Sequence, residues 1–191
     1  MSYITDRIDQ KVAKILKEGG VGFMPAETVY GLSCLAMNET AVERIYRFKY
    51  RFTGKPFIVL ISNIEQLPLL NIDKKAADVA EKYWPGALTY VCEAPDAPYW
   101  LTRNTKSLAV RIPDHSNLRK LINKVGPIVS TSANLYAHKP ARNLAEAQKY
   151  FAEKIDFYVD VGEIEGQPST IVRSNNGKLE ILRQGSVEIN T

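Results

Sequence analysis

Apolar runs of strand length alternate with segments of helical spacing along nearly the whole chain, and this alternation most limits how the chain can fold. Apolar residues recur at helical spacing from Ile8 through Val12 to Leu16, and the Gly-Gly pair that follows predicts the end of that helix. Alternating strands and helices indicate an α/β fold, and the strands clustered near the carboxyl end favour a mixed sheet. We expect strands at 21–25, 56–61, 88–92, 107–112, 127–133, 156–162, 169–173 and 179–183, and further helices at 38–49, 74–84, 117–125 and 143–151.

Polar residues stand where several of these helices should begin. Asn38 and Ser116 are side chains that commonly accept a hydrogen bond from the first helical turn. Asn143 and Glu146 have the spacing of a capping box in which Asn replaces the usual Ser or Thr. The sequence therefore predicts capped starts for three of the helices.

The length of the chain, 191 residues, fits one large domain or two small ones. The sequence contains no linker-like stretch and no internal repeat, so one domain over residues 1–191 is the simplest expectation. The longest apolar runs, such as residues 57–61, are far too short to cross a bilayer, and the charged N-terminus lacks the apolar core of a signal peptide. We therefore expect a cytoplasmic protein with no membrane partner.

Several common kinds of site find no support in the sequence. Cys34 and Cys92 are far apart and form no CxxC pair, so we expect no disulfide framework. His115 and His138 stand alone, which argues against a metal site built from side chains. There is no GxGxxG motif for a dinucleotide. Residues 53–56, TGKP, resemble the end of a P-loop, but the first glycine of that motif is missing and Pro replaces its magnesium-binding hydroxyl.

A mild excess of basic residues, with a formal net charge of +4, is compatible with an anionic ligand such as a nucleotide or RNA. Lys49, Arg51 and Lys55 gather at the end of a predicted helix and in the loop before the strand at 56–61. Cations at the edge of a sheet can hold phosphates, because Arg binds two oxygens at once and Lys acts as a point charge. The alternative is a solvated charged loop.

Small polar side chains follow the apolar residues of the segment VSTSAN, 129–134. Ser130, Thr131, Ser132 and Asn134 come at the carboxyl end of a predicted strand. Hydroxyls and free backbone N–H groups in this place suit a phosphate or a carboxylate. The same residues could equally form a turn that hydrogen-bonds its own backbone, so both interpretations stay open.

Arg111 ends an apolar strand, which predicts a buried stem and a guanidinium at the rim of the sheet. Its anionic partner is either a ligand or Asp114. Ser169, Thr170 and Arg183 lie near later strand ends and repeat this pattern of hydroxyls and cations. Together with the two preceding segments, they predict one mouth suited to a nucleoside triphosphate and a small polar partner.

A family resemblance rests on the order of these segments rather than on any one of them. The segments are PAETVYGL (25–32), KYR (49–51), GKPFIVLI (54–61), WPGALT (84–89), SLAVRIPDH (107–115), STSAN (130–134), PSTIV (168–172) and RQG (183–185). In their order and rough spacing, from about residue 8 to 185, the chain resembles the YrdC/Sua5 family, in its short form without an extra C-terminal domain. Ala26, Phe52 and Leu60 differ from the residues usual in that family at their positions.

The resemblance implies a YrdC-like fold, with one twisted mixed sheet, flanking helices and a basic cavity. It also implies an L-threonylcarbamoyladenylate synthase, which joins L-threonine, bicarbonate and ATP into threonylcarbamoyl-AMP and releases pyrophosphate. A transferase complex would then use the product to modify adenosine 37 of tRNA. Mg²⁺ is expected to arrive with ATP, because the sequence shows no ligand set for it.

The resemblance also assigns residues to the two sides of the site. Lys49 and Arg51 are the candidate catalytic residues, because cations beside the phosphates stabilise the charge that develops as pyrophosphate leaves. The implied threonine side comprises Thr28, Tyr30, Leu60, Arg111, Ser130 and Ser169, and the implied nucleotide side comprises Lys49, Arg51, Lys55, Ser107, Ser132, Asn134 and Arg183.

Two other functions are alternatives to the synthase. A non-catalytic RNA-binding paralogue would keep the fold and a basic cavity, but it would not need the full set of substrate segments. A carbamoyl-transferring relative that uses carbamoyl phosphate typically carries this module in a longer chain with cysteine-rich zinc motifs, and this chain has two cysteines. Weak RNA binding by the synthase itself is compatible with the basic excess.

Overall fold

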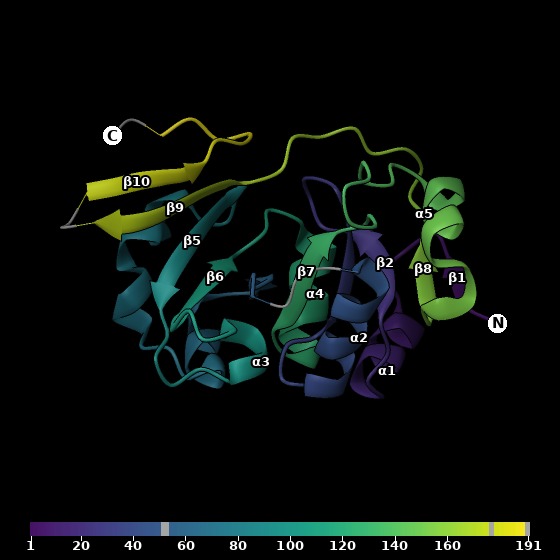
Figure 1. The fold of residues 1–191 in the computed structure, drawn as a ribbon, viewed down its shortest axis with the longest axis horizontal. Coiled ribbons are helices and arrows are strands. Elements are labelled where there is room, and N and C mark those ends of the chain that lie inside the picture. Colours follow the sequence, from purple (N-terminus) through teal and green to yellow (C-terminus); the bar gives the residue numbers. More distant parts are fainter. Residues whose placement is uncertain (51–53, 176–177, 190–191) are drawn as a thin grey trace.

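A computed structural model describes residues 1–50, 54–175 and 178–189. Within these residues, ten strands form one sheet in the order β1-β8-β2-β3-β7-β4-β6-β5-β9-β10 (Figure 1). The pairs β1–β8, β2–β8, β4–β6 and β5–β9 are parallel. The pairs β2–β3, β3–β7, β4–β7, β5–β6 and β9–β10 are antiparallel. The predicted α/β fold with a single mixed sheet is confirmed.

The bounds of the elements follow the predicted alternation closely, and the elements outside the predicted ranges are β1, β3, α3, η1 and η3. The segment predicted as a helix at 74–84 is a 3-10 helix, η2, and its bounds are Lys74–Tyr83. The strands are β1 Tyr3–Thr5, β2 Gly22–Pro25, β3 Tyr30–Leu35, β4 Ile58–Leu60, β5 Leu88–Glu93, β6 Ser107–Arg111, β7 Ile128–Ser132, β8 Phe157–Val159, β9 Thr170–Asn175 and β10 Lys178–Arg183. The α-helices are α1 Gln10–Lys17, α2 Glu39–Lys49, α3 Tyr99–Thr102, α4 Ser116–Val125 and α5 Leu144–Phe151, and the other 3-10 helices are η1 Ile64–Leu70 and η3 Ala152–Lys154.

Most of the predicted helix starts are confirmed. The side chains of Asn38 and Asn143 accept hydrogen bonds from the first turns of α2 and α5. The cap predicted at Ser116 is wrong by one residue, because His115 Nδ1 accepts the backbone N–H of Leu118. An imidazole nitrogen therefore supplies the acceptor that a hydroxyl was expected to supply.

Two clusters of buried side chains cover the sheet. Phe23 and Met24 are neighbours on β2 and belong to different clusters, because successive side chains of a strand point to opposite faces. Helices α1 and α4 pack in the cluster of Met24, where Leu16 and Leu121 are buried. Helix α2 packs in the cluster of Phe23 through Ile45. The sheet is thus buried on both faces, which explains its continuous apolar runs.

The chain passes from β8 to β9 through residues 160–169, which run along one edge of the molecule and link distant parts of the sheet (Figure 1). The hydroxyl of Tyr30 fixes the start of this segment, because it donates to the Gly162 carbonyl and accepts the Val161 N–H. An added Cβ at Gly166 would lie 2.0 Å from the carbonyl oxygen of Thr28, so the segment passes directly over the turn between β2 and β3. The described helices include none that is long and apolar enough to span a membrane.

Candidate functional site

A cavity of about 190 Å³ opens where the middle strands of the sheet meet β9 and β10. It brings together side chains that are far apart in the sequence, from the β2–β3 turn, from β4, β6 and β7, and from the segments around β9 and the end of β10. Much of the predicted site is therefore in one place. The predicted residues that line this cavity are Thr28, Leu60, Arg111, Ser130, Ser132, Ser169 and Arg183.

The register of the strands explains how the floor of the cavity forms. Leu60 pairs with Arg111 on one side and with Ile128 on the other, so β4 and β6 end together beside β7. Gly31 on β3 lies against Ser130, and an added Cβ there would be 2.8 Å from the Ser130 hydroxyl oxygen. The missing side chain of Gly31 therefore leaves the space that the Ser130 hydroxyl occupies.

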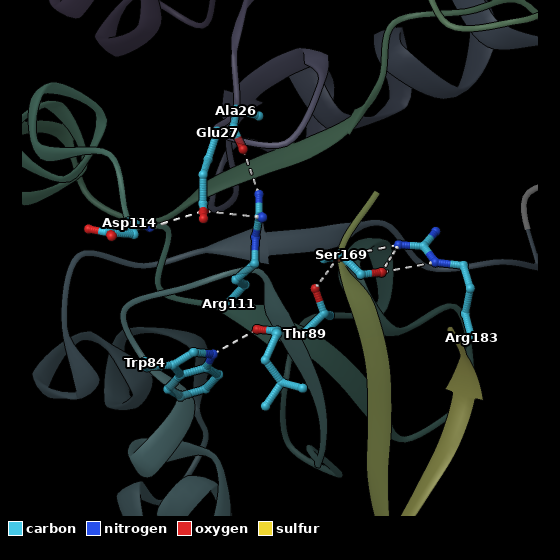
Figure 2. A network of polar contacts seen from close by, with 9 residues as sticks. Ala26, Glu27, Trp84, Thr89, Arg111, Asp114, Ser169 and Arg183 are labelled. Atoms are coloured by element: carbon cyan, nitrogen blue, oxygen red, sulfur yellow. Dashed lines mark hydrogen bonds and ion pairs between the residues drawn. The ribbon is translucent and has the colours of Figure 1, made fainter. Parts of the chain in front are cut away.

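Arg111 is the most deeply buried cation of the cavity, with a side chain that is 4% exposed. Its Nη2 donates to the Ala26 carbonyl at 2.7 Å, and its Nη1 donates to the Glu27 carboxylate at 3.3 Å (Figure 2). Its Nε has no hydrogen-bond partner within the described part of the chain. Burial lowers the pKa of Arg111, Glu27 opposes that shift, and the charge of Arg183 adds to it. The cavity is thus lined by a desolvated guanidinium that has more N–H donors than these two acceptors use.

The partner of Arg111 settles one alternative from the sequence. The carboxylate that contacts the guanidinium belongs to Glu27, whereas the Asp114 carboxylate lies 3.8 Å from Arg119. Asp114 contributes its backbone N–H instead, which donates to Glu27 Oε2 at 3.0 Å (Figure 2). Of the two alternatives left open by the sequence, the one in which the Asp114 carboxylate pairs with Arg111 is therefore wrong.

The second cation, Arg183, is held by Ser169 on the opposite side of the cavity. Arg183 Nη2 donates to the Ser169 carbonyl at 2.7 Å and to its hydroxyl at 3.2 Å. The Ser169 hydroxyl also shares a hydrogen bond of 2.8 Å with the buried hydroxyl of Thr89 on β5 (Figure 2). Thr89 was not among the predicted residues, although a lone hydroxyl within an apolar strand is a signal that could have marked it.

Lys49 points inward and builds the turn that follows β7. Its side chain is 3% exposed, and its ammonium group donates to the Ser132 carbonyl. It also donates to the carbonyl and to the side-chain oxygen of Asn134, at 2.9 Å each. The structure therefore corrects the prediction that the Lys49 ammonium faces the cavity as a phosphate ligand.

The segment 129–134 combines the two interpretations left open by its sequence. Ser130 and Ser132 line the cavity, as a ligand site requires. Asn134 is turned into the loop instead, where its Oδ1 accepts from the Ser132 hydroxyl and its Nδ2 donates to the Leu135 and His138 carbonyls. Asn134 holds the turn, so its predicted nucleotide contact is not supported by its position.

Two further predicted residues lie away from the cavity. Ser107 begins β6 whereas Arg111 ends it, and Ser107 lines a separate hollow with Lys106 and Asn175. Ser107 therefore does not line the cavity with the other predicted residues, and its nucleotide contact stays a prediction. The Tyr30 side chain is fully buried and stacks on Phe23, so it supports the cavity from the core without lining it.

The remaining predicted cations surround the cavity less closely. Lys55 is exposed and directly precedes Pro56, which lines the cavity. Arg51 lies outside the described residues, as does Phe52. Among the described lining residues, Arg111 and Arg183 are charged and neither Asp nor Glu is present. A more extensively basic cavity stays a prediction.

These features define an α/β protein with a mixed sheet whose central cavity presents arginines and hydroxyls. The family model for Sua5, YciO and YrdC, which carries the description "Telomere recombination", matches residues 14–185. The chain belongs to this Sua5/YciO/YrdC family, which confirms the resemblance inferred from the ordered segments.

Relatives of known name cover most of the chain. The threonylcarbamoyl-AMP synthase of Pseudoalteromonas translucida is 40% identical over 174 residues, which are 86% of this chain and 91% of the relative. The threonylcarbamoyl-AMP synthase of Shigella flexneri is 38% identical over 179 residues, which are 90% of this chain and 92% of the relative.

Solved structures agree with the fold. P. abyssi Sua5 complexed with L-threonine has a TM-score of 0.84 and 32% identity to this chain. The match covers 97% of this chain but 57% of the longer Sua5 chain. E. coli YciO, at 22% identity, shares the fold with a TM-score of 0.82 over 98% of both chains.

Proposed function

We propose that the protein is an L-threonylcarbamoyladenylate synthase, which joins L-threonine, bicarbonate and ATP into threonylcarbamoyl-AMP and releases pyrophosphate. The observation that carries this proposal is the cavity in which Arg111, with its unpartnered Nε, lies near Thr28, Ser130 and Ser169. A buried guanidinium among hydroxyls suits the carboxylate and polar groups of an amino acid. The names of the relatives support the same activity.

The proposed reaction forms two bonds in sequence. The neutral amine of threonine attacks the carbon of bicarbonate or CO₂ and gives a carbamate, with loss of water in the case of bicarbonate and of a proton to solvent in the case of CO₂. A carbamate oxygen then attacks the α-phosphorus of ATP, and the bond to pyrophosphate breaks. No residue of the chain need be a covalent nucleophile, so the protein contributes position and charge.

The described residues suggest how the two substrates are arranged. Arg111 would bind the threonine carboxylate, with Ser130, Ser169 and Thr28 beside it and Leu60 as an apolar wall. Arg183 and Ser132 would contact the nucleotide. ATP is the substrate in its Mg²⁺ complex, and cations beside its phosphates would stabilise the developing negative charge.

The part of Lys49 in this reaction is indirect. It holds the turn that positions Ser132, so the cations proposed to contact phosphates are Arg51, Lys55 and Arg183. Arg51 remains the proposed catalytic cation. The product would serve a transferase complex that modifies adenosine 37 of tRNA in the cytoplasm, and weak direct affinity for RNA is part of the same proposal.

Pyrophosphate release from ATP tests the proposed function. With bicarbonate and Mg²⁺ present, we expect release that depends on L-threonine and that disappears in Arg51→Ala. Arg173→Ala is the matched control, because Arg173 is an arginine of β9 that pairs with Glu180 outside the cavity. Its rate should equal that of the wild type. A folded protein that neither releases pyrophosphate nor binds ATP would contradict the proposal and favour the RNA-binding paralogue.

Gly31→Ala tests the floor of the cavity. The added Cβ would lie 2.8 Å from the Ser130 hydroxyl, which must move, so we expect the KM for threonine to rise about tenfold. The free energy of unfolding should fall by about 1–3 kcal/mol, as in other overpacked sites. Steady-state kinetics at saturating ATP measure the first effect and urea denaturation the second.

The double variant Gly31→Ala/Ser130→Ala separates crowding from loss of the hydroxyl. It removes the oxygen that meets the new methyl group, so stability should recover toward the wild-type value. The KM for threonine should stay raised, because the Ser130 hydroxyl is part of the proposed site. An unchanged KM in Gly31→Ala would show that threonine does not use this floor.

A further inference from the structure

Glu27 is a charged residue in the turn between β2 and β3, and its backbone is unusual. Its φ angle is +75°, in the left-handed region that glycine adopts readily and that strains other residues. Such strain persists where the surrounding structure enforces it, and it concentrates at functional sites. We therefore expect contacts of the Glu27 side chain to hold the backbone in this conformation.

The Glu27 carboxylate makes two such contacts. Its Oε2 accepts from Arg111 Nη1 and also from the backbone N–H of Asp114, so one oxygen joins the end of β6 to the loop that follows (Figure 2). The neighbouring Ala26 carbonyl accepts from Arg111 Nη2. The β2–β3 turn thus holds both terminal nitrogens of the guanidinium.

This arrangement leaves the Nε of the guanidinium without an acceptor. Arg111 Nε is buried and has no acceptor among the residues that the structure describes, while the side chain itself lines the cavity. Glu27 is absent from the described lining of the cavity, although its neighbours Ala26 and Thr28 belong to it. Glu27 consequently contacts the anion-binding group without reaching the space for the anion.

We propose that Glu27 is a positioning residue that fixes the guanidinium of Arg111, a residue that lines the cavity, for binding the carboxylate of the substrate amino acid. The inference rests on the proposed function and deepens it. An arginine held in advance loses less conformational freedom when the ligand binds, which raises affinity without any new contact. Without Glu27, the side chain of Arg111 would sample other rotamers, and the loop at Asp114 would lose an anchor.

The experiment compares three variants of the full chain with the wild type. Glu27→Gln keeps the shape and an acceptor oxygen but removes the charge. Glu27→Gly removes the side chain and relieves the strain at φ +75°. Glu43→Gln is the matched control, because Glu43 forms an ion pair with Arg103, whose side chain is also 4% exposed, and neither residue lines the cavity.

Isothermal titration with L-threonine and steady-state kinetics give the readouts. We expect the threonine Kd to rise about tenfold in Glu27→Gly and about threefold in Glu27→Gln, since a hydrogen bond to a charged group is lost or weakened. The KM for threonine should rise in parallel while the KM for ATP and kcat stay within about twofold. Glu43→Gln should lower the melting temperature and leave the threonine Kd unchanged.

The outcomes separate this inference from the function on which it rests. A wild-type protein that binds no L-threonine would overturn both. A wild-type protein that binds threonine, with an unchanged Kd in Glu27→Gly, would overturn the positioning role alone. Equal rises in the Kd of Glu27→Gly and Glu43→Gln would also overturn it, because they would reveal a general loss of structure.

Discussion

Replacing Arg111 with methionine is expected to lower kcat/KM for threonine by about 10²–10³-fold. The change keeps most of the apolar stem and removes the buried guanidinium, which is 4% exposed and has an unpartnered Nε among the described atoms. Truncating one partner of a buried, hydrogen-bonded charge pair between a protein and its ligand costs about 2–5 kcal/mol of binding free energy, and each 1.4 kcal/mol corresponds to a factor of ten. The loss should appear mainly in the KM for threonine, measured by pyrophosphate release at saturating ATP.

Arg103→Met provides the control for the loss of a buried arginine. Arg103 pairs with Glu43 at 2.6 Å and lies over the Tyr46 ring at 4.0 Å, away from the cavity. It should destabilise the fold while leaving kcat/KM of the remaining folded protein near the wild-type value. A threonine KM that is unchanged in Arg111→Met would contradict the assignment of the carboxylate to this arginine.

Replacing Lys49 with methionine is expected to lower the free energy of unfolding by about 3–5 kcal/mol and to remove most of the activity. The ammonium group donates to the Ser132 carbonyl and to two oxygens of Asn134, and methionine leaves these acceptors without it. Buried acceptors that lose a charged donor cost about 1–3 kcal/mol each. Denaturation in guanidinium chloride measures the stability, and pyrophosphate release measures the activity.

Lys55→Met distinguishes a structural lysine from one that contacts the nucleotide. Lys55 is exposed, so its loss should change the free energy of unfolding by about 0.5 kcal/mol or less. The KM for ATP should rise. If Lys49→Met instead kept full stability and raised the KM for ATP as Lys55→Met does, Lys49 would contact phosphate directly. The ammonium group would then not point inward when ATP is bound.

The order of elements could be predicted because apolar runs of strand length differ clearly from helical spacing. Strand β3, YGLSCL, escaped this approach because Gly31 and Ser33 resemble turn residues, yet both lie buried in the sheet. The absence of a side chain at Gly31 makes room for the hydroxyl of Ser130, which lies 99 positions further along the chain. A requirement of that kind arises only once distant strands are paired.

The site was predictable where chemistry coincides with a strand end, as at Arg111, Ser169 and Arg183. The site was not predictable where it depends on which end of a strand a residue occupies or on which way its side chain points. Ser107 lies on the same strand as Arg111 but at its other end. The ammonium of Lys49 turns toward the protein interior, and a linear motif does not record which way a side chain points.

Because Ser169 and Arg183 complete the wall of the cavity, a chain growing on the ribosome cannot finish this site until residue 183 has been synthesised. Tyr3 pairs with Phe157, and Leu88 pairs with Thr170, so early strands must wait for late ones. Pairings between such distant residues slow folding. Until β8 and β9 arrive, the nascent chain exposes unpaired strand edges, and it is at that stage that chaperones would protect it from aggregation.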